Sequence, residues 1–112
     1  MYDPASSREW KALARAAYVA ACGAGSPFTG PVRVEILALW PCPASARKAD
    51  AGDWRWRTSK PDADNVAKAV LDAGNGILWE DDSQVVVLNV RKVVGARGAE
   101  PRVEVTVSSV LP

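Results

Sequence analysis

The sequence predicts one small α+β domain, spanning residues 1–112, in which two helices pack on a mixed β-sheet. The chain has 112 residues, which is the usual size of a single domain. Apolar residues recur at helical spacing in two segments and follow strand-like patterns in three others. These segments come in the order helix, strand, helix, strand, strand, with no internal repeat and no linker. That order favours a layer of helices on one sheet.

The first helix is expected over about residues 4–22. Asp3 and Pro4 can supply its N-cap and first helical position, and Ser6 with Glu9 is a competing capping box. An apolar stripe follows at helical spacing, made of Trp10, Leu13, Ala14, Ala17, Tyr18 and Ala21. Glycines and a proline within residues 23–27 end the segment.

The first strand is expected over residues 32–40. Its first half has one polar face, with Arg33 and Glu35, whereas its second half is apolar on both faces. The second pattern is typical of a strand in the middle of a sheet. Residues 41–60 show neither the helical nor the strand spacing of apolar residues. They are expected to form a long loop, of the kind that tends to be functional or disordered.

The second helix is expected over residues 64–73, with Gly74 and Gly76 as its stop signal. Two runs rich in β-branched residues follow, at residues 84–92 and 102–107. Because glycines lie in the connection between them, we expect an antiparallel hairpin whose loop is longer than a tight turn.

Composition excludes several classes of site. The chain has no histidine, so Ser-His-Asp and Cys-His catalysis and the usual zinc sites are excluded. Cys22 and Cys42 are far apart and match no paired motif, which indicates a reduced, cytoplasmic chain. No apolar run approaches the roughly 20 residues of a membrane span, and no signal-peptide pattern opens the sequence. A membrane partner is therefore not expected, and the small size makes a homodimer plausible.

The charges are unevenly distributed, although the net charge is only +1. Residues 47–60 hold five bases and two acids, whereas residues 62–82 hold six acids and one base, Lys68. Acids repel phosphate, so a purely electrostatic DNA-binding protein would not need them. A bound divalent cation would reverse their local sign.

The acids have a suggestive spacing. Asp62 and Asp64 are two residues apart and point to the same side of an extended entry into the helix, which one of them would cap. Lys68 lies one turn after Asp64 and therefore shares its face. Asp82 leads into the next strand, and packing of that strand on the helix could return it to the helix start.

Three converging carboxylates without histidine or cysteine suit Mg²⁺, which prefers oxygen ligands. At a phosphodiester such an ion stabilises developing charge and lowers the pKa of a bound water, and a nearby lysine can assist. Each motif alone is more often a cap, an exposed ion pair or a turn. Their occurrence together and in order is what favours a metal site.

The segment KPDADNVAKAVLDAGNGILWEDDSQV, residues 60–85, resembles the signature of the RusA family of Holliday junction resolvases. The order and spacing agree, and so do the flanking helix, the flanking strands and the basic position at Lys92. The resemblance implies a homodimeric, Mg²⁺-dependent endonuclease that nicks four-way DNA junctions symmetrically in recombination and repair. Family members usually begin with an additional strand, and this N-terminal strand is expected to be missing here.

The resemblance also implies roles for individual residues. It makes Asp62, Asp64 and Asp82 catalytic metal ligands and Lys68 the essential lysine. Four neighbours are expected to support them, namely Asp81, Asp72, Asn65 and Gln84. Of these, Asp81 sits beside a ligand, Asp72 would orient Lys68 or cap the helix end, and the two amides would fix ligands or backbone.

The loop before this segment interleaves aromatic and basic residues, which suits stacking on unpaired bases and contact with phosphate. The residues expected to bind DNA are Trp54, Arg55, Trp56, Arg57 and Lys60. The alternative is that one tryptophan belongs to the core and the bases only solubilise the loop. Trp10 and Trp40 are expected in the core, and Trp79 in the core or a dimer interface.

Two other functions stay open on the sequence. The same carboxylates would serve a Mg²⁺-dependent nuclease that cuts other branched or duplex DNA. A non-catalytic or truncated DNA-binding remnant of the fold would keep the aspartates without using them. Cleavage tests on junction, flap and linear DNA separate these readings.

Overall fold

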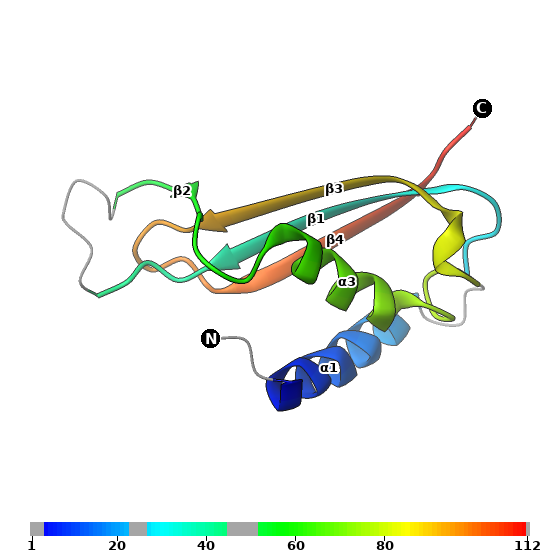
Figure 1. Cartoon of the computed structure of the whole chain (residues 1–112), viewed down its shortest axis with the longest axis horizontal. Helices are drawn as coiled ribbons and strands as arrows, with labels where there is room; N and C mark the ends of the chain where they lie inside the picture. The colour runs from blue at the N-terminus through cyan, green and yellow to red at the C-terminus, as the bar shows by residue number, and fades with distance from the viewer. Residues whose placement is uncertain (1–3, 23–26, 45–51, 112) are drawn as a thin grey trace.

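The computed structural model describes residues 4–22, 27–44 and 52–111. Its elements in chain order are α1 (Pro4–Cys22), β1 (Val32–Trp40), β2 (Arg55–Trp56), α3 (Ala63–Gly74), the 3₁₀ turn η1 (Asp82–Gln84), β3 (Val85–Val94) and β4 (Arg102–Ser109). Both helices lie on the same side of the sheet (Figure 1). The predicted class, helices on a mixed sheet in one α+β domain, is confirmed. No helix in the described ranges is long and apolar enough to cross a membrane.

The sheet has the order β2-β3-β1-β4, with β1 parallel to β3 and antiparallel to β4. β1 therefore occupies an interior position, as its apolar second half predicted. Its alternate residues Val32, Val34, Ile36 and Ala38 are buried against the helices, whereas Arg33 and Glu35 are exposed on the other face.

The expected hairpin of the last two strands is wrong, because β1 lies between β3 and β4. Residues 95–101 carry the chain past the end of β1, where the Gly95 N–H donates to the Trp40 carbonyl at 2.9 Å. In its second half β1 buries Ile36 and Ala38 on one face and half-buries Leu37 and Leu39 on the other, which suits a strand with two strand neighbours. The run that forms β4 alternates cleanly, which suits an edge strand with one solvated face.

The expected loop over residues 41–60 also holds a strand that the sequence analysis did not predict. β2 pairs antiparallel with the end of β3, with Arg55 opposite Val94 and Trp56 opposite Val93. Two residues are too few for an alternating pattern to be visible in the sequence.

The core lies between the sheet and the helices. Its fully or almost fully buried members are Val32, Val34, Ile36, Val70, Leu78 and Trp79. Trp79 is 0% exposed, which settles it as a core residue of this chain. Trp10 and Tyr18 of α1 pack against this cluster, and burial raises the pKa of Tyr18 to about 12.

Candidate functional site

The start of α3 presents two solvent-exposed carboxylates. Asp62 occupies the N-cap position with extended backbone, but its side chain makes no capping hydrogen bond. Its carboxylate instead accepts from Lys60 Nζ at 3.2 Å, in a pair exposed on both sides. Asp64 follows in the first turn of α3 and is also exposed. Neither carboxylate is buried, so both are open to a ligand from solvent.

Further along α3, Lys68 is exposed one turn after Asp64. Asp72 contacts α1 instead of Lys68, because Lys11 Nζ lies 3.3 Å from its carboxylate. Arg15 Nη2 donates to the Asp72 carbonyl at 3.3 Å. Asp72 therefore ties α3 to α1, which differs from the predicted role of orienting Lys68 or capping the helix.

Asp82 is held by the core. The indole Nε1 of Trp79 donates to Asp82 Oδ1 at 2.7 Å. The Trp79 ring packs so closely on Gly74, at the end of α3, that a Cβ there would lie 3.0 Å from it. A buried indole N–H usually needs a hydrogen-bond acceptor, and the Asp82 carboxylate is that acceptor. One oxygen of Asp82 is therefore fixed beside the C-terminal end of α3.

The turn that carries Asp82 is fixed by its neighbours. Asp81 accepts from the Ser83 N–H at 3.1 Å and from the Ser83 hydroxyl, and the hydroxyl bond lowers the pKa of Asp81. Gln84 Oε1 accepts from the backbone N–H groups of Glu80 and Asp81, at 2.8 and 2.9 Å.

The same Gln84 side chain reaches the chain before β1. Its Nε2 donates to the carbonyls of Phe28 and Gly30, each at 2.9 Å. The backbone-fixing role expected of Gln84 is what the structure shows. Asn65 contributes a backbone hydrogen bond, in which its N–H donates to the Asp62 carbonyl at 3.1 Å.

The three predicted metal ligands do not meet within one chain. Asp62 and Asp64 lie at the start of α3 and Asp82 beyond its end, and a helix of 12 residues is about 18 Å long. Figure 1 shows η1 at the opposite end of α3 from the segment that follows β2. Within the described ranges, no three acidic or cysteine side chains are grouped closely enough to hold a metal.

The expected return of Asp82 to the helix start is therefore wrong for a single chain. A strand that packs antiparallel to a helix brings its far end, and not its beginning, to the helix start. The three-carboxylate set does not fit a metal ion in one copy. The exposed pair Asp62 and Asp64 does suit Mg²⁺, which commonly takes one or two carboxylates and keeps several waters.

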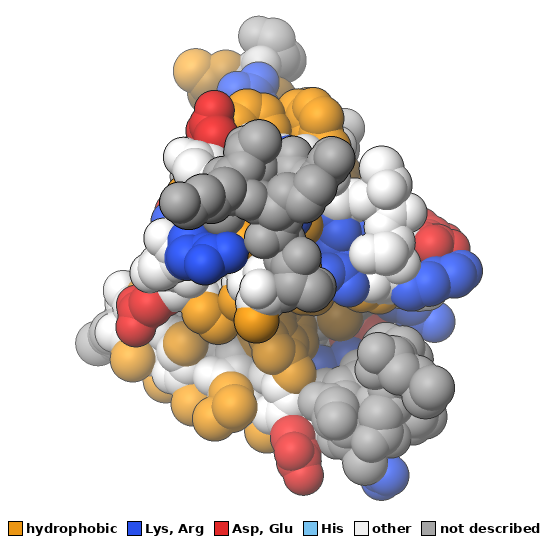
Figure 2. Space-filling view, turned by 90° about the vertical axis from the view of Figure 1, so that its left-hand side faces the viewer, with side chains coloured by type: hydrophobic (Ala, Val, Ile, Leu, Met, Phe, Trp, Pro, Cys, Tyr) orange, Lys and Arg blue, Asp and Glu red, His pale blue; other side chains and the backbone are white. Residues whose placement is uncertain are grey.

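The loop before α3 exposes two aromatic rings. Trp54 and Trp56 are 53% and 59% exposed, with their rings edge to face at 4.9 Å. Figure 2, which views this end of the molecule, shows Lys and Arg side chains beside hydrophobic ones. The arrangement leaves aromatic faces available for stacking on bases.

Arg57 has a structural role in this loop. Its guanidinium lies 4.3 Å from the centre of the Trp40 ring, and its Nη2 donates to the Lys60 carbonyl at 2.6 Å. Lys92 Nζ donates to the Ser59 carbonyl at 2.9 Å. These contacts fix the path from β2 to Asp62. Trp40 is half-buried against Arg57 rather than lying in the central core.

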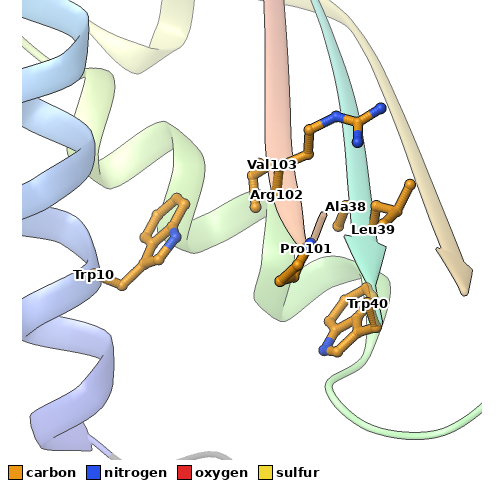
Figure 3. A pocket seen from close by; sticks show the side chains of 7 residues that line it. All are labelled: Trp10, Ala38, Leu39, Trp40, Pro101, Arg102 and Val103. Carbon is orange, nitrogen blue, oxygen red and sulfur yellow. The ribbon is translucent and has the colours of Figure 1, made fainter. Parts of the chain in front are cut away.

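An apolar hollow of about 390 Å³ lies between α1 and the sheet, away from the carboxylates. Figure 3 shows Trp10 reaching into it from α1, with Trp40 at the end of β1 and Pro101 and Val103 at the start of β4. It contains none of the predicted ligands, and the exposed pair Asp62 and Asp64 lies outside it, at the start of α3.

The fold and the surface together define a class of protein, an α+β domain with exposed carboxylates next to a basic, aromatic loop. The model of the endodeoxyribonuclease RusA family matches residues 1–108. The chain belongs to the RusA endodeoxyribonuclease family. This confirms the resemblance found in residues 60–85.

Two relatives support the assignment. An uncharacterized protein of Bacillus subtilis (strain 168), YqaN, is 39% identical over an alignment 121 positions long. The alignment covers 98% of this chain and 79% of that protein. The crossover junction endodeoxyribonuclease rusA of Lactococcus phage r1t is 36% identical over 58 residues, covering 51% of this chain and 42% of that protein. No solved structure matches the chain significantly.

Sequence reasoning missed the support given to Asp82 by Trp79 and the link from Asp72 to α1. The first had a visible signal, since a tryptophan in an apolar run, three residues before an acid, needs a partner for its N–H once buried. The second had none, because Lys11 and Asp72 are 61 positions apart.

Proposed function

We propose that this protein is a Mg²⁺-dependent endodeoxyribonuclease that cuts branched DNA, with the four-way junction as substrate, in recombination and repair. Membership of the RusA family supports the reaction and the substrate class. The observation that carries the proposal is the exposed pair Asp62 and Asp64 at the start of α3, with Lys68 one turn beyond. We further propose that it acts as a homodimer in the cytoplasm.

The residues of this chain would divide the work. Asp62 and Asp64 would hold Mg²⁺, which supplies charge stabilisation at the phosphate. Lys68, on the same face, would contact the phosphate that is cut. Trp54 and Trp56 would stack on bases that are splayed at the junction centre, and Lys60 and Arg55 would contact the backbone.

The test is incubation of the purified protein with a labelled synthetic four-way junction, with Mg²⁺ or with EDTA. We expect paired symmetric nicks in the junction when Mg²⁺ is present and none with EDTA. We expect no nicks in linear duplex DNA. Asp62→Asn and Asp64→Asn should each abolish cleavage and keep junction binding, since they remove the proposed Mg²⁺ ligands and also reduce repulsion of phosphate. Lys68→Ala should lower the rate more than the affinity.

Glu100→Gln is the matched control, because it removes an exposed acid in the connection between β3 and β4. It should cleave like the wild type. Cleavage retained by either aspartate variant would remove that residue from the set of ligands.

A DNA-binding protein without cleavage is the second candidate, and the separation of Asp82 from the start of α3 favours it. In the same assay it would bind the junction and leave it intact with Mg²⁺ present. Cleavage of flaps or linear DNA in preference to the junction would instead identify a nuclease that acts on other branched or duplex DNA.

A further inference from the structure

We propose that α1 carries a second DNA-binding surface, which contacts the sugar–phosphate backbone of a duplex arm that leaves the candidate site. The surface is a row of three bases, Arg8, Lys11 and Arg15, which we call the basic row. The inference rests on the proposed function, because it takes branched DNA as the ligand. It adds the path that an arm follows beyond the carboxylates at the start of α3.

The first observation is that the three bases share one side of α1. They occupy positions i, i+3 and i+7, which lie on one face of a helix. At 1.5 Å per residue the row is about 10 Å long. The α1 sequence contains one acid, Glu9, which follows Arg8 directly and therefore points to a different side of the helix. The basic row thus presents positive charge that no acid of its own helix interrupts.

The second observation is that the basic row adjoins the exposed side of α3. Lys11 and Arg15 both reach Asp72, at 3.3 Å each. Lys68 shares a face of α3 with Asp72, one turn earlier. Both helices run in the same direction along the sheet (Figure 1). Stepping back one turn from Asp72 therefore brings exposed Lys68 level with the part of α1 that carries exposed Arg8.

The third observation is the surplus of positive charge on this surface. The Asp72 carboxylate pairs with Lys11, whereas Arg15 bonds to the Asp72 carbonyl, which is neutral. The side chains of Arg8 and Arg15 are both exposed. With Lys68 included, four cations lie near one paired acid, so the surface favours an anionic partner.

The opposite face of the sheet shows that this surplus is local. There Arg33 and Glu35 alternate along β1 and are both exposed. On β4, Arg102 Nε lies 2.8 Å from the Glu104 carboxylate. Because acids balance the bases on that face, a general need for solubility does not account for the basic row.

The chemistry of the basic row fits phosphate. The planar guanidinium of arginine matches the geometry of phosphate oxygens, and bases 3.4 Å apart along each strand make a row of about 10 Å span roughly three base pairs. Backbone contacts position a protein on DNA without reading sequence. The basic row would therefore hold a duplex arm, with Lys68 at the phosphate that is cut and Trp54 and Trp56 at the junction centre.

The first experiment measures how salt weakens binding of the full chain to a labelled synthetic four-way junction, in EDTA. Each cation that neutralises a phosphate contributes about 0.9 to the slope of log K against log salt concentration. Arg8→Gln and Arg15→Gln should each lower the slope by about 0.9, and the double variant by about twice that amount. Arg8→Lys and Arg15→Lys keep the charge and should keep the slope.

Arg33→Gln is the matched control, because it removes the same charge from an exposed position on the face of the sheet away from the helices. It should keep the wild-type slope. An unchanged slope in the double variant Arg8→Gln/Arg15→Gln, or an equal fall in Arg33→Gln, would overturn the proposal. So would a wild type whose binding does not depend on salt.

The second experiment repeats the titration with a linear duplex of the same total length. Since backbone contacts with an arm carry no information about the branch point, the double variant should lose affinity for the duplex and for the junction by the same factor. A loss confined to the junction would place the basic row at the junction centre and overturn its assignment to an arm.

These measurements separate failure of the inference from failure of the proposed function, because neither needs cleavage. If the wild type nicks the junction with Mg²⁺ and the double variant keeps the wild-type slope, the basic row is wrong and the function stands. If the wild type leaves the junction intact while the double variant loses slope as expected, the function is wrong and the basic row stands.

Discussion

The two ends of α3 carry the same kind of side chain in opposite surroundings. At the start, Asp62 and Asp64 lie in solvent, and the pair between Asp62 and Lys60 is exposed on both sides. Beyond the end, Asp82 is bonded to fully buried Trp79, and Gln84 ties its turn to the chain before β1.

The difference shows that packing holds the Asp82 carboxylate in place, whereas the two carboxylates at the start of α3 are left in solvent. A side chain held by packing has already lost its rotamer freedom on folding, whereas a solvated side chain loses it only when a ligand binds. The free energy of unfolding should therefore depend on the contacts around Asp82. Rearrangement on ligand binding should take place around Asp62. The following substitutions test that contrast.

The largest effect is expected at Trp79. Trp79→Ala removes a fully buried ring and should lower the free energy of unfolding by about 3–5 kcal/mol. Trp79→Phe keeps most of the packing but loses the bond to Asp82, at a cost of about 1–2 kcal/mol. Urea denaturation measures both. Equal losses in the two variants would mean that the hydrogen bond, and not the packing, dominates.

A smaller loss is expected at Gln84, whose side chain makes four hydrogen bonds to backbone groups. Gln84→Ala should lower the free energy of unfolding by about 1–3 kcal/mol. Amide hydrogen exchange should speed up at Glu80 and Asp81. Gln84→Glu, which keeps the acceptor and loses the donor, should leave those two amides more protected than Ala does. Unchanged exchange in Gln84→Ala would contradict the fixed turn.

The smallest effect concerns pH. Bonds from Ser83 lower the pKa of Asp81 below its ordinary value of 3.8, so the charged form is favoured in the folded turn. The stabilisation is present above that ordinary value and is lost as the pH falls through the lowered pKa. Ser83→Ala should raise the pKa of Asp81 towards 3.8, as measured by NMR titration of its carboxyl carbon. An unchanged pKa would mean that Ser83 does not bond to Asp81 in solution.

The sequence predicted what depends on neighbours along the chain. The bounds of α1, α3 and β1 follow from apolar periods and glycine stops, and the exposed pair Asp62 and Asp64 follows from the entry into α3. The position of β1 between β3 and β4 depends on pairing between distant segments. The place of Asp82 depends on the length and direction of α3, which local spacing does not report.

The interior position of β1 has a consequence for synthesis of the chain. Both strands that flank β1 are made after it, since β3 spans Val85–Val94 and β4 spans Arg102–Ser109. At about 5–20 residues per second, the ribosome needs about 3–12 s to go from the end of β1 to the start of β4. The apolar run from Ile36 to Trp40 lacks at least one of its two strand partners through that interval, so it is open to aggregation in the nascent chain.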